Sequence, residues 1–194
     1  MSTTQLIGLT SPMPQCGKST VACHLRDRGY AHAPFAFPLK QMIVQFLRLW
    51  GLAELEICEL MEHHKEQVIP ELGVSVRHLC QTLGTEWGRT CVSPAVWVQA
   101  WERRWSGPLA AGGRVVVDDV RFPEEAAAIR RLGGKLIWLE RRDHSMPEQV
   151  LAHASEGSLH EDCADLLPLI LQVEDLCSLA EDLAAGRVCE WRRN

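Results

Sequence analysis

The stretch from Gln5 to Thr20, QLIGLTSPMPQCGKST, contains the residues from which the fold can be predicted. It begins with the apolar run Leu6–Thr10, which predicts a buried strand. The prolines at positions 12 and 14 indicate a loop. A helix is then expected from Lys18 to about Arg28, because Gly29 is a typical residue just past a helix C-terminus. A buried strand, a loop and a helix in this order are typical of a parallel α/β fold.

Gly17, Lys18 and Ser19 stand at the junction between this loop and this helix. A helix N-terminus presents unpaired amides and its dipole favours an anion, so Gly-Lys-Ser at such a junction indicates a phosphate-binding loop. Gly17 lets the backbone approach a phosphate closely. Lys18 can reach the terminal phosphates of a nucleotide, and the Ser19 hydroxyl can ligate Mg²⁺.

The loop departs from the full phosphate-binding pattern at its start. That pattern has a glycine five residues before Gly17, where this chain has Pro12, and the nearest earlier glycine is Gly8. Pro12 and Pro14 each remove a backbone donor from a loop that binds phosphate through its amides. An ordinary strand–turn–helix connection with a surface lysine is the alternative interpretation.

Composition excludes several classes of protein. The chain has 194 residues, 46% of them hydrophobic and 23% charged, which suits one well-buried domain. No apolar run is long enough for a membrane span, and no leader pattern is present, so we expect a soluble protein of the cytoplasm. The net charge of −5 argues against broad binding to polymeric nucleic acid. The eight cysteines include no Cys-x-x-Cys pair, and we expect most of them to be buried apolar residues rather than disulfide partners.

A second pattern lies at Val115–Val117, which is followed by Asp118 and Asp119. Three consecutive valines predict a strand buried on both faces, as in a parallel sheet. Ligands of open α/β sheets bind at the carboxyl ends of the strands, so either aspartate could hold Mg²⁺ through water. Four basic residues are candidates to clamp phosphates: Lys40, Arg77, Arg121 and Arg141.

Strand and helix patterns alternate along the rest of the chain. Helices are expected from Pro38 to Gly51, over 54–66, from Ser75 as N-cap, over 95–105, over 124–132 and over 175–185. Strands are expected at 33–37, 135–139 and 167–171, with a connector at 69–73. The segment Gly84–Arg89 breaks the helical periodicity and is unusually polar. Trp97, Trp101 and Trp105 share one helical stripe, which is more typical of packing than of ligand stacking.

Five strings of the sequence resemble the phage-type deoxynucleoside monophosphate kinases, a branch of the P-loop nucleoside monophosphate kinase fold. They occur in the order of that family and cover nearly the whole chain. They are Phe35–Lys40 (FAFPLK), Ser75–Arg89 (SVRHLCQTLGTEWGR), Trp97–Val98, Asp119–Glu125 (DVRFPEE) and His153–Glu156 (HASE).

The resemblance implies a three-layer α/β fold in which helices flank a parallel sheet. It implies one P-loop kinase domain over 1–194, with a helical insertion for the acceptor at roughly 38–106. The reaction implied is transfer of the ATP γ-phosphate, with Mg²⁺, to a deoxynucleoside 5′-monophosphate. The resemblance and the motifs together assign catalysis to Lys18 and Arg121, ATP binding to Gly17, Lys18, Ser19, Thr20 and Arg141, the acceptor to Lys40, Arg77, Trp97, Asp119, Glu125 and Glu156, and the metal to Ser19 and Asp118.

Two further departures from the family pattern lie outside the loop. Phe37 stands where the family commonly has an aspartate, and Gln172–Asp175 replaces its usual Asn-Asp-Gly turn. Two alternatives therefore stay open: a P-loop kinase acting on a hydroxymethylated pyrimidine in DNA, and a non-catalytic nucleotide-binding protein.

The expected partners are small nucleotides rather than polymeric nucleic acid or a membrane. A homodimer is left open, and for a viral protein, such as one from a bacteriophage, the compartment would be the host cytoplasm.

Overall fold

The computed structural model describes residues 4–11, 16–141, 169–171 and 175–187. The chain divides into two compact units. Unit 1 comprises Met1–Phe35 and Trp101–Asn194, and unit 2 comprises Ala36–Ala100. Each unit is described by itself below. Within the described residues, no helix combines the length and the apolar character needed to cross a membrane.

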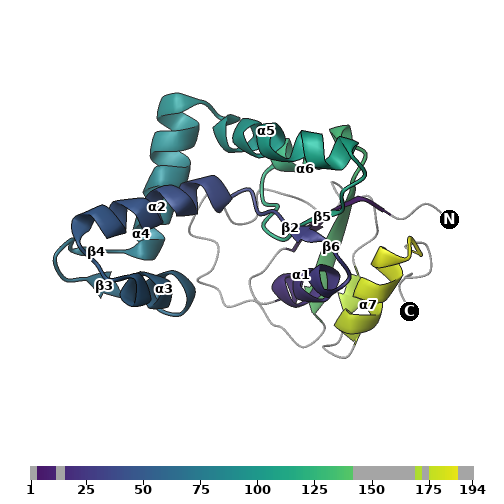
Figure 1. The fold of residues 1–194 in the computed structure, drawn as a ribbon, viewed down its shortest axis with the longest axis horizontal. Helices are drawn as coiled ribbons and strands as arrows, with labels where there is room; N and C mark the ends of the chain where they lie inside the picture. Colours follow the sequence, from purple (N-terminus) through teal and green to yellow (C-terminus); the bar gives the residue numbers. More distant parts are fainter. Residues whose placement is uncertain (1–3, 12–15, 142–168, 172–174, 188–194) are drawn as a thin grey trace. The chain divides into compact units, whose positions relative to one another are not determined.

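Unit 1 is built on a five-stranded parallel sheet whose strand order is β2-β5-β1-β6-β7 (Figure 1). Its strands are β1 (Leu6–Thr10), β2 (Ala31–His32), β5 (Val115–Val117), β6 (Lys135–Arg141) and β7 (Leu169–Leu171). β1 is central, with Ile7 beside Val116 of β5 on one side and Lys135 of β6 on the other. This arrangement confirms the predicted α/β fold with a buried parallel sheet.

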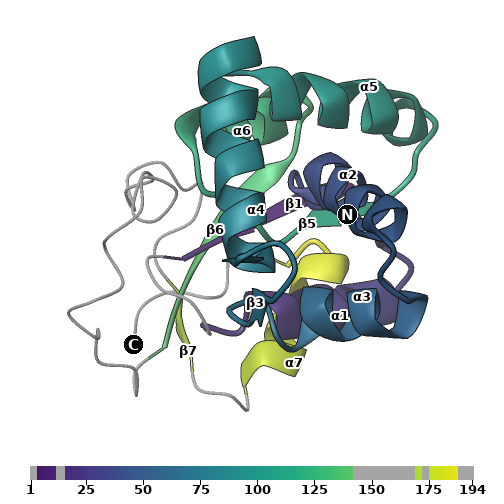
Figure 2. The same ribbon diagram turned by 90° about the vertical axis from the view of Figure 1, so that its left-hand side faces the viewer.

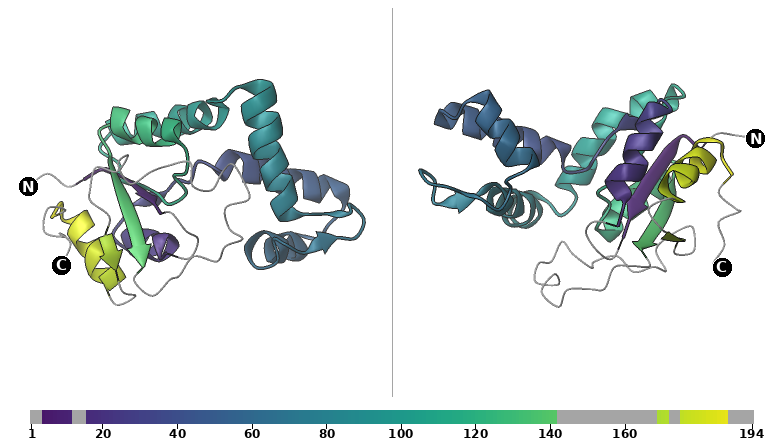
Figure 3. Two further views of the ribbon diagram at one scale, coloured as in Figure 1. Left: turned by 180° about the vertical axis from the view of Figure 1, so that it is seen from behind. Right: turned by 90° about the horizontal axis from the view of Figure 1, so that it is seen from below.

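Alternation along β1 sends successive side chains to opposite faces of the sheet. On one face Ile7 and Leu9 belong to a buried cluster with residues of α1 (Lys18–Asp27) and α7 (Asp175–Ala184). On the other face a Cβ added at Gly8 would lie 3.3 Å from Ile129 of α6 (Pro123–Arg131). Helices therefore cover both faces of the sheet. Figure 3 shows α1 and α7 next to each other beside the strands.

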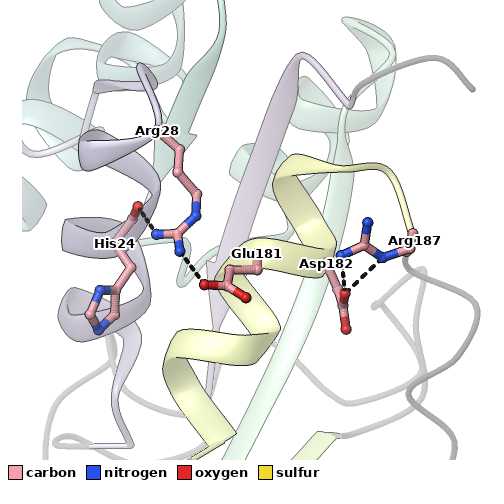
Figure 4. Close-up of polar contacts among 5 residues, drawn as sticks. All are labelled: His24, Arg28, Glu181, Asp182 and Arg187. Carbon is pink, nitrogen blue, oxygen red and sulfur yellow. Dashed lines mark hydrogen bonds and ion pairs between the residues drawn. The ribbon is translucent and has the colours of Figure 1, made fainter.

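Polar contacts fasten the C-terminal end of α1 to α7 (Figure 4). The Arg28 guanidinium donates to the His24 carbonyl at 2.8 Å and to Glu181 Oε1 of α7 at 2.7 Å. Leu176 at the other end of α7 is 3% exposed and lies against Gly17 at the start of α1. Hence α7 contacts both ends of α1.

Unit 2 packs α2 (Phe37–Trp50), α3 (Glu54–Glu62) and α4 (Val76–Gln81) around its own buried cluster. Pro38 lies in the first turn of α2, and Gly51, at φ 107°, ends it, as predicted. The Ser75 hydroxyl accepts from the His78 amide and caps α4, which is also as predicted. The connector expected at 69–73 lies within an antiparallel hairpin, formed by β3 (Val68–Ile69) and β4 (Val74–Ser75).

The segment that breaks helical periodicity is a π-helix, η1 (Thr82–Val92), which continues directly from α4 (Figure 2). The next helix, α5 (Val96–Ala110), carries the tryptophan stripe. The Trp97 indole donates its Nε1–H to the Gly84 carbonyl at 2.8 Å, and its ring lies against Gly88. Trp97 and Trp101 are buried and Trp105 is half-buried, so the packing role expected for the stripe is confirmed at its first two members.

Three expectations were wrong. The strand predicted at 33–37 lies at Ala31–His32, and residue 37 already begins α2. The helix predicted over 54–66 ends at Glu62. Among the described cysteines, Cys16 is buried, whereas Cys23, Cys58 and Cys91 are exposed. None of the six cysteines in the described part of the chain is joined in a disulfide.

Candidate active site

The N-terminus of α1 has the geometry expected of a phosphate-binding junction. Gly17 precedes the helix with φ 91°, the left-handed region that glycine adopts without steric cost. In the described part of the loop and helix, no side-chain hydrogen bond caps α1, and its first turn contains no acidic residue. The dipole of the helix therefore acts at this end without a compensating carboxylate on the helix itself. Pro12, Pro14 and the rest of 12–15 lie outside the described residues.

Lys18 points back toward the strand that precedes the loop. Its Nζ donates a hydrogen bond to the hydroxyl of Ser11, which directly follows β1. The side chain of Lys18 is half-buried, whereas Ser19 and Thr20 in the same turn are exposed. This contact joins the start of α1 to the residue that follows β1, and a lysine at this position of a P-loop protein binds nucleotide phosphates.

Asp118 brings the carboxyl end of β5 into contact with α1. Its Oδ2 lies 3.2 Å from the hydroxyl of Ser19, and its Oδ1 lies 2.6 Å from His32 Nε2 at the end of β2. The strands are parallel, so their carboxyl ends meet at one edge of the sheet, where ligand sites form in α/β proteins. The two residues assigned to the metal are thus neighbours, although 99 positions separate them in the sequence.

The Ser19–Asp118 pair fits a Mg²⁺ site. Octahedral Mg²⁺ with ligands at about 2.1 Å places adjacent ligand oxygens about 3 Å apart, which is close to the separation of these two oxygens. A hydroxyl and a carboxylate are oxygen ligands of the kind Mg²⁺ prefers, and it commonly takes the others from water and phosphate. Among the described residues, no three histidine, cysteine or acidic side chains gather as a metal site.

The neighbouring Asp119 and Glu125 hold the backbone around this edge. Asp119 Oδ1 accepts the Phe35 amide at 2.8 Å, which secures the chain just after β2. Glu125 is 3% exposed, and its Oε2 accepts the amides of Arg121 and Phe122 at 2.8 and 3.1 Å. Both carboxylates therefore have a structural contact in addition to the acceptor role assigned from the sequence.

Three other residues assigned to the acceptor, Lys40, Arg77 and Trp97, lie in unit 2. Arg77 pairs with Glu66, and its amide donates to the Lys65 carbonyl at 2.8 Å. Burial and the nearby charges of Lys40 and Arg77 lower the pKa of Lys65. The same three cations lie near the Cys80 thiol, whose pKa is nevertheless raised because burial outweighs them. Unit 2 therefore concentrates positive charge around two of the residues assigned to the acceptor.

The aromatic residue assigned to the acceptor is used for packing within unit 2. Trp97 is 5% exposed and its indole nitrogen is hydrogen-bonded to Gly84. Trp87 on η1 has its ring centroid 6.3 Å from that of Trp97 and is 44% exposed. Of these two neighbouring rings, Trp87 has the larger surface available for contact with a ligand.

Three assigned residues cannot be placed in the site. Glu156 and the departure at 172–174 lie outside the described residues, and for Arg141 only the backbone at the end of β6 is described. Arg121 is exposed between β5 and α6.

Sequence reasoning missed His32 and Lys65. Neither belongs to a local motif, and His32 is adjacent to Asp118 only because β2 pairs with β5.

Comparison with known proteins identifies the family of the chain. A family model described as "Deoxynucleotide monophosphate kinase" matches residues 51–178, a range that includes η1 and both aspartates but not the loop before α1. The chain is 30% identical over 148 residues to the "Putative deoxynucleotide monophosphate kinase" of Acanthamoeba polyphaga mimivirus, covering 69% of this chain and 75% of that one. The chain belongs to the deoxynucleotide monophosphate kinase family.

Proposed function

We propose that this protein transfers the γ-phosphate of ATP, bound with Mg²⁺, to a deoxynucleoside 5′-monophosphate and releases ADP and the diphosphate. The observation that carries the proposal is the contact between Ser19 on α1 and Asp118 after β5, in a chain of this family. Phosphoryl transfer depends mainly on positioning and on electrostatic stabilisation, so a cradle, a metal site and nearby cations are the parts it needs.

On the donor side, the amides of the first turn of α1 would bind the phosphate oxygens, with Gly17 allowing the close approach. Lys18 would compensate the charge that develops on the transferred group, and Ser19 and Asp118 would hold the metal, which neutralises phosphate charge when bound. Thr20 completes the first turn. Arg121 and Arg141, placed after β5 and at the end of β6, are proposed as further phosphate ligands.

On the acceptor side, the cations of unit 2 support a phosphate ligand. Burial and like charges lower the pKa of Lys65, which means that its protonated form is less favourable in the folded protein than in water. A phosphate dianion bound near Lys40 and Arg77 would relieve that repulsion. Arginine can grip a phosphate through two donors at once, which suits Arg77 to this role. Asp119, Glu125 and Glu156 stay proposed for the sugar or base, and Trp97 or its exposed neighbour Trp87 for stacking.

The test is an ADP-release assay with ATP, Mg²⁺ and a panel of deoxynucleoside and ribonucleoside monophosphates, with duplex and single-stranded DNA alongside. We expect turnover with one or more deoxynucleoside monophosphates. Lys18→Ala should lower turnover on the order of 100-fold or more because it removes charge compensation in the transition state. Lys135→Ala, at the start of β6, is the matched control and should leave turnover unchanged.

Two results would contradict the proposal. Labelling of DNA from γ-labelled ATP, with free monophosphates inert, would assign the acceptor to polymeric DNA. Absence of nucleotide binding at millimolar ATP analogue would instead favour a protein that kept the fold without the activity. Near-wild-type turnover of Lys18→Ala at an unchanged melting temperature would remove that lysine from the mechanism.

A further inference from the structure

His32, the last residue of β2, makes a close contact with the carboxylate that faces the phosphate-binding helix. Its Nε2 lies 2.6 Å from Asp118 Oδ1, while Asp118 Oδ2 lies 3.2 Å from the Ser19 hydroxyl. The side chain of Asp118 is 12% exposed and that of His32 is 34% exposed. One carboxylate is therefore held between two side chains that come from different elements, β2 and α1.

The chemistry of the contact fixes the direction of the hydrogen bond. An ionised carboxylate has acceptors only, so the ring nitrogen must carry the proton and donate it. The terminal torsion of an aspartate is broad, so a hydrogen bond to one carboxylate oxygen restricts the direction of the other. With His32 holding Oδ1, the other oxygen is directed toward Ser19, where the two metal ligands proposed above meet.

The backbone shows that this bond is not needed to attach β2 to the sheet. The Ala31 amide donates to the Arg114 carbonyl at 2.8 Å, and the Ala33 amide donates to the Val116 carbonyl at 2.9 Å. These bonds flank His32 and already fix the strand against β5. A side-chain bond from His32 to Asp118 therefore has its main effect on the carboxylate rather than on the strand.

We propose that His32 is a positioning residue for the metal–nucleotide complex: it donates to Asp118 Oδ1 and so orients Oδ2 toward the ion that Ser19 and Asp118 hold. The inference rests on the proposed function, because it requires that ATP binds with Mg²⁺ at this edge of the sheet. Hydrogen-bond partners of metal-ligating groups typically change metal affinity 10- to 100-fold when they are removed.

Titration calorimetry with a non-hydrolysable analogue, adenylyl imidodiphosphate, tests this inference with Mg²⁺ and separately with EDTA. His32→Ala should weaken binding about 10-fold or more in Mg²⁺ and leave binding in EDTA unchanged within about twofold. His32→Gln, whose side-chain amide can reach the position of Nε2, should restore affinity in Mg²⁺ to within about threefold of the wild type. His63→Ala, an exposed histidine of unit 2, is the control and should match the wild type in both buffers.

A double-mutant cycle gives the second measurement. If His32 acts through Asp118, the loss caused by His32→Ala should disappear in an Asp118→Asn background, because the oriented carboxylate is already gone. Equal losses for His32→Ala with and without Mg²⁺, no loss at all, or full additivity with Asp118→Asn would each overturn the role of His32. Failure of the wild-type protein to bind the analogue in Mg²⁺ would instead overturn the proposed function on which the inference rests.

Discussion

The indole ring of Trp97 occupies the space that a side chain at Gly88 would need. A Cβ built at Gly88 would lie 2.6 Å from Trp97 Cζ2, well inside normal contact distance. Gly84 lies one turn earlier in the same π-helix, and its carbonyl accepts the Trp97 hydrogen bond. The atom nearest to a Cβ built at Gly84 is Leu39 Cδ2, at a distance of 3.6 Å. The two glycines therefore differ in what a methyl group would meet, although both are buried.

Gly88→Ala should destabilise unit 2 by about 1–3 kcal/mol, since the added methyl group forces the buried ring or the helix to shift. Gly84→Ala is the matched control. It should be neutral or stabilising by up to about 1 kcal/mol, because alanine loses less backbone entropy than glycine in a helix. Denaturant unfolding of both variants measures the difference. Equal effects of the two substitutions would show that Trp97 does not fill the space beside Gly88.

Gly17→Ala should weaken ATP-analogue binding and lower the melting temperature. Gly17 has φ 91°, and a Cβ there would lie 2.7 Å from Leu176 Cδ1 of α7. Gly133→Ala is the control, because that residue also has positive φ, at 75°, but nothing lies within 4 Å of its built Cβ. We expect Gly133→Ala to lower the free energy of unfolding by about 1 kcal/mol, which is the cost of placing alanine at a positive φ. A similar loss for both variants would remove the Leu176 contact from the explanation.

Substitutions at Asp119 separate its structural contact from the proposed acceptor contact. Asp119→Asn keeps an oxygen that can accept the Phe35 amide, whereas Asp119→Ala leaves that amide without this acceptor. We expect Asp119→Asn to keep its melting temperature while the KM for the monophosphate rises about 10-fold, on the scale of a lost charged hydrogen bond. A lower melting temperature with unchanged kinetics for both variants would assign Asp119 to the fold alone.

Lys65→Met should raise the thermal stability of the protein and weaken use of the monophosphate. Burial together with Lys40 and Arg77 lowers the pKa of Lys65 in the folded protein. At pH values below the pKa of an unfolded lysine, the protonated side chain therefore destabilises the folded protein. Removing the charge relieves that cost at neutral pH, and the benefit should vanish as the pH rises above the pKa of an unfolded lysine. Thermal melts at pH 7 and pH 11, with a KM measured at pH 7, check both parts. A lower melting temperature at pH 7 would contradict the prediction.

Arg77→Lys should raise the KM for the monophosphate without changing the affinity for the ATP analogue. Lysine keeps the charge but not the planar pair of donors, so a loss of about 1–3 kcal/mol in kcat/KM is expected. Arg48→Lys, which disturbs an exposed pair with Glu54 in the same unit, serves as the control. Arg77 also pairs with exposed Glu66. A change in melting temperature alone would leave Arg77 with only this surface ion pair.

Much of the fold could be predicted because its signals are local. The valines of β5, Gly51 after α2 and the Ser75 cap each have a short-range physical cause, and all three lie where expected. β2 was misplaced because Ala33 and Phe35 are buried in the manner of a strand. Their burial comes from the packing of Trp101, whose ring centroid lies 4.8 Å from that of Phe35 and whose indole donates to the Ala33 carbonyl.

The candidate site was only partly predictable for the same reason. Gly17, Lys18 and Ser19 form a contiguous motif, and Asp118 follows a recognisable strand, so each could be selected from the sequence. The contact of Asp118 with His32 depends on which strands pair, and no local pattern encodes it. The positive charge around Lys65 depends likewise on α2, α4 and the segment after α3 packing together in unit 2.

The insertion of unit 2 between β2 and β5 has a consequence for folding kinetics. His32 and Asp118 are 86 positions apart, so pairing β2 with β5 closes a long loop that contains all of unit 2. Closing a flexible loop of that length costs entropy before any sheet contact is gained. If unit 2 folds first through its own short-range contacts, the chain between β2 and β5 has lost most of its conformational freedom before the strands pair. A substitution inside unit 2, far from the sheet in sequence, would then slow the assembly of the sheet.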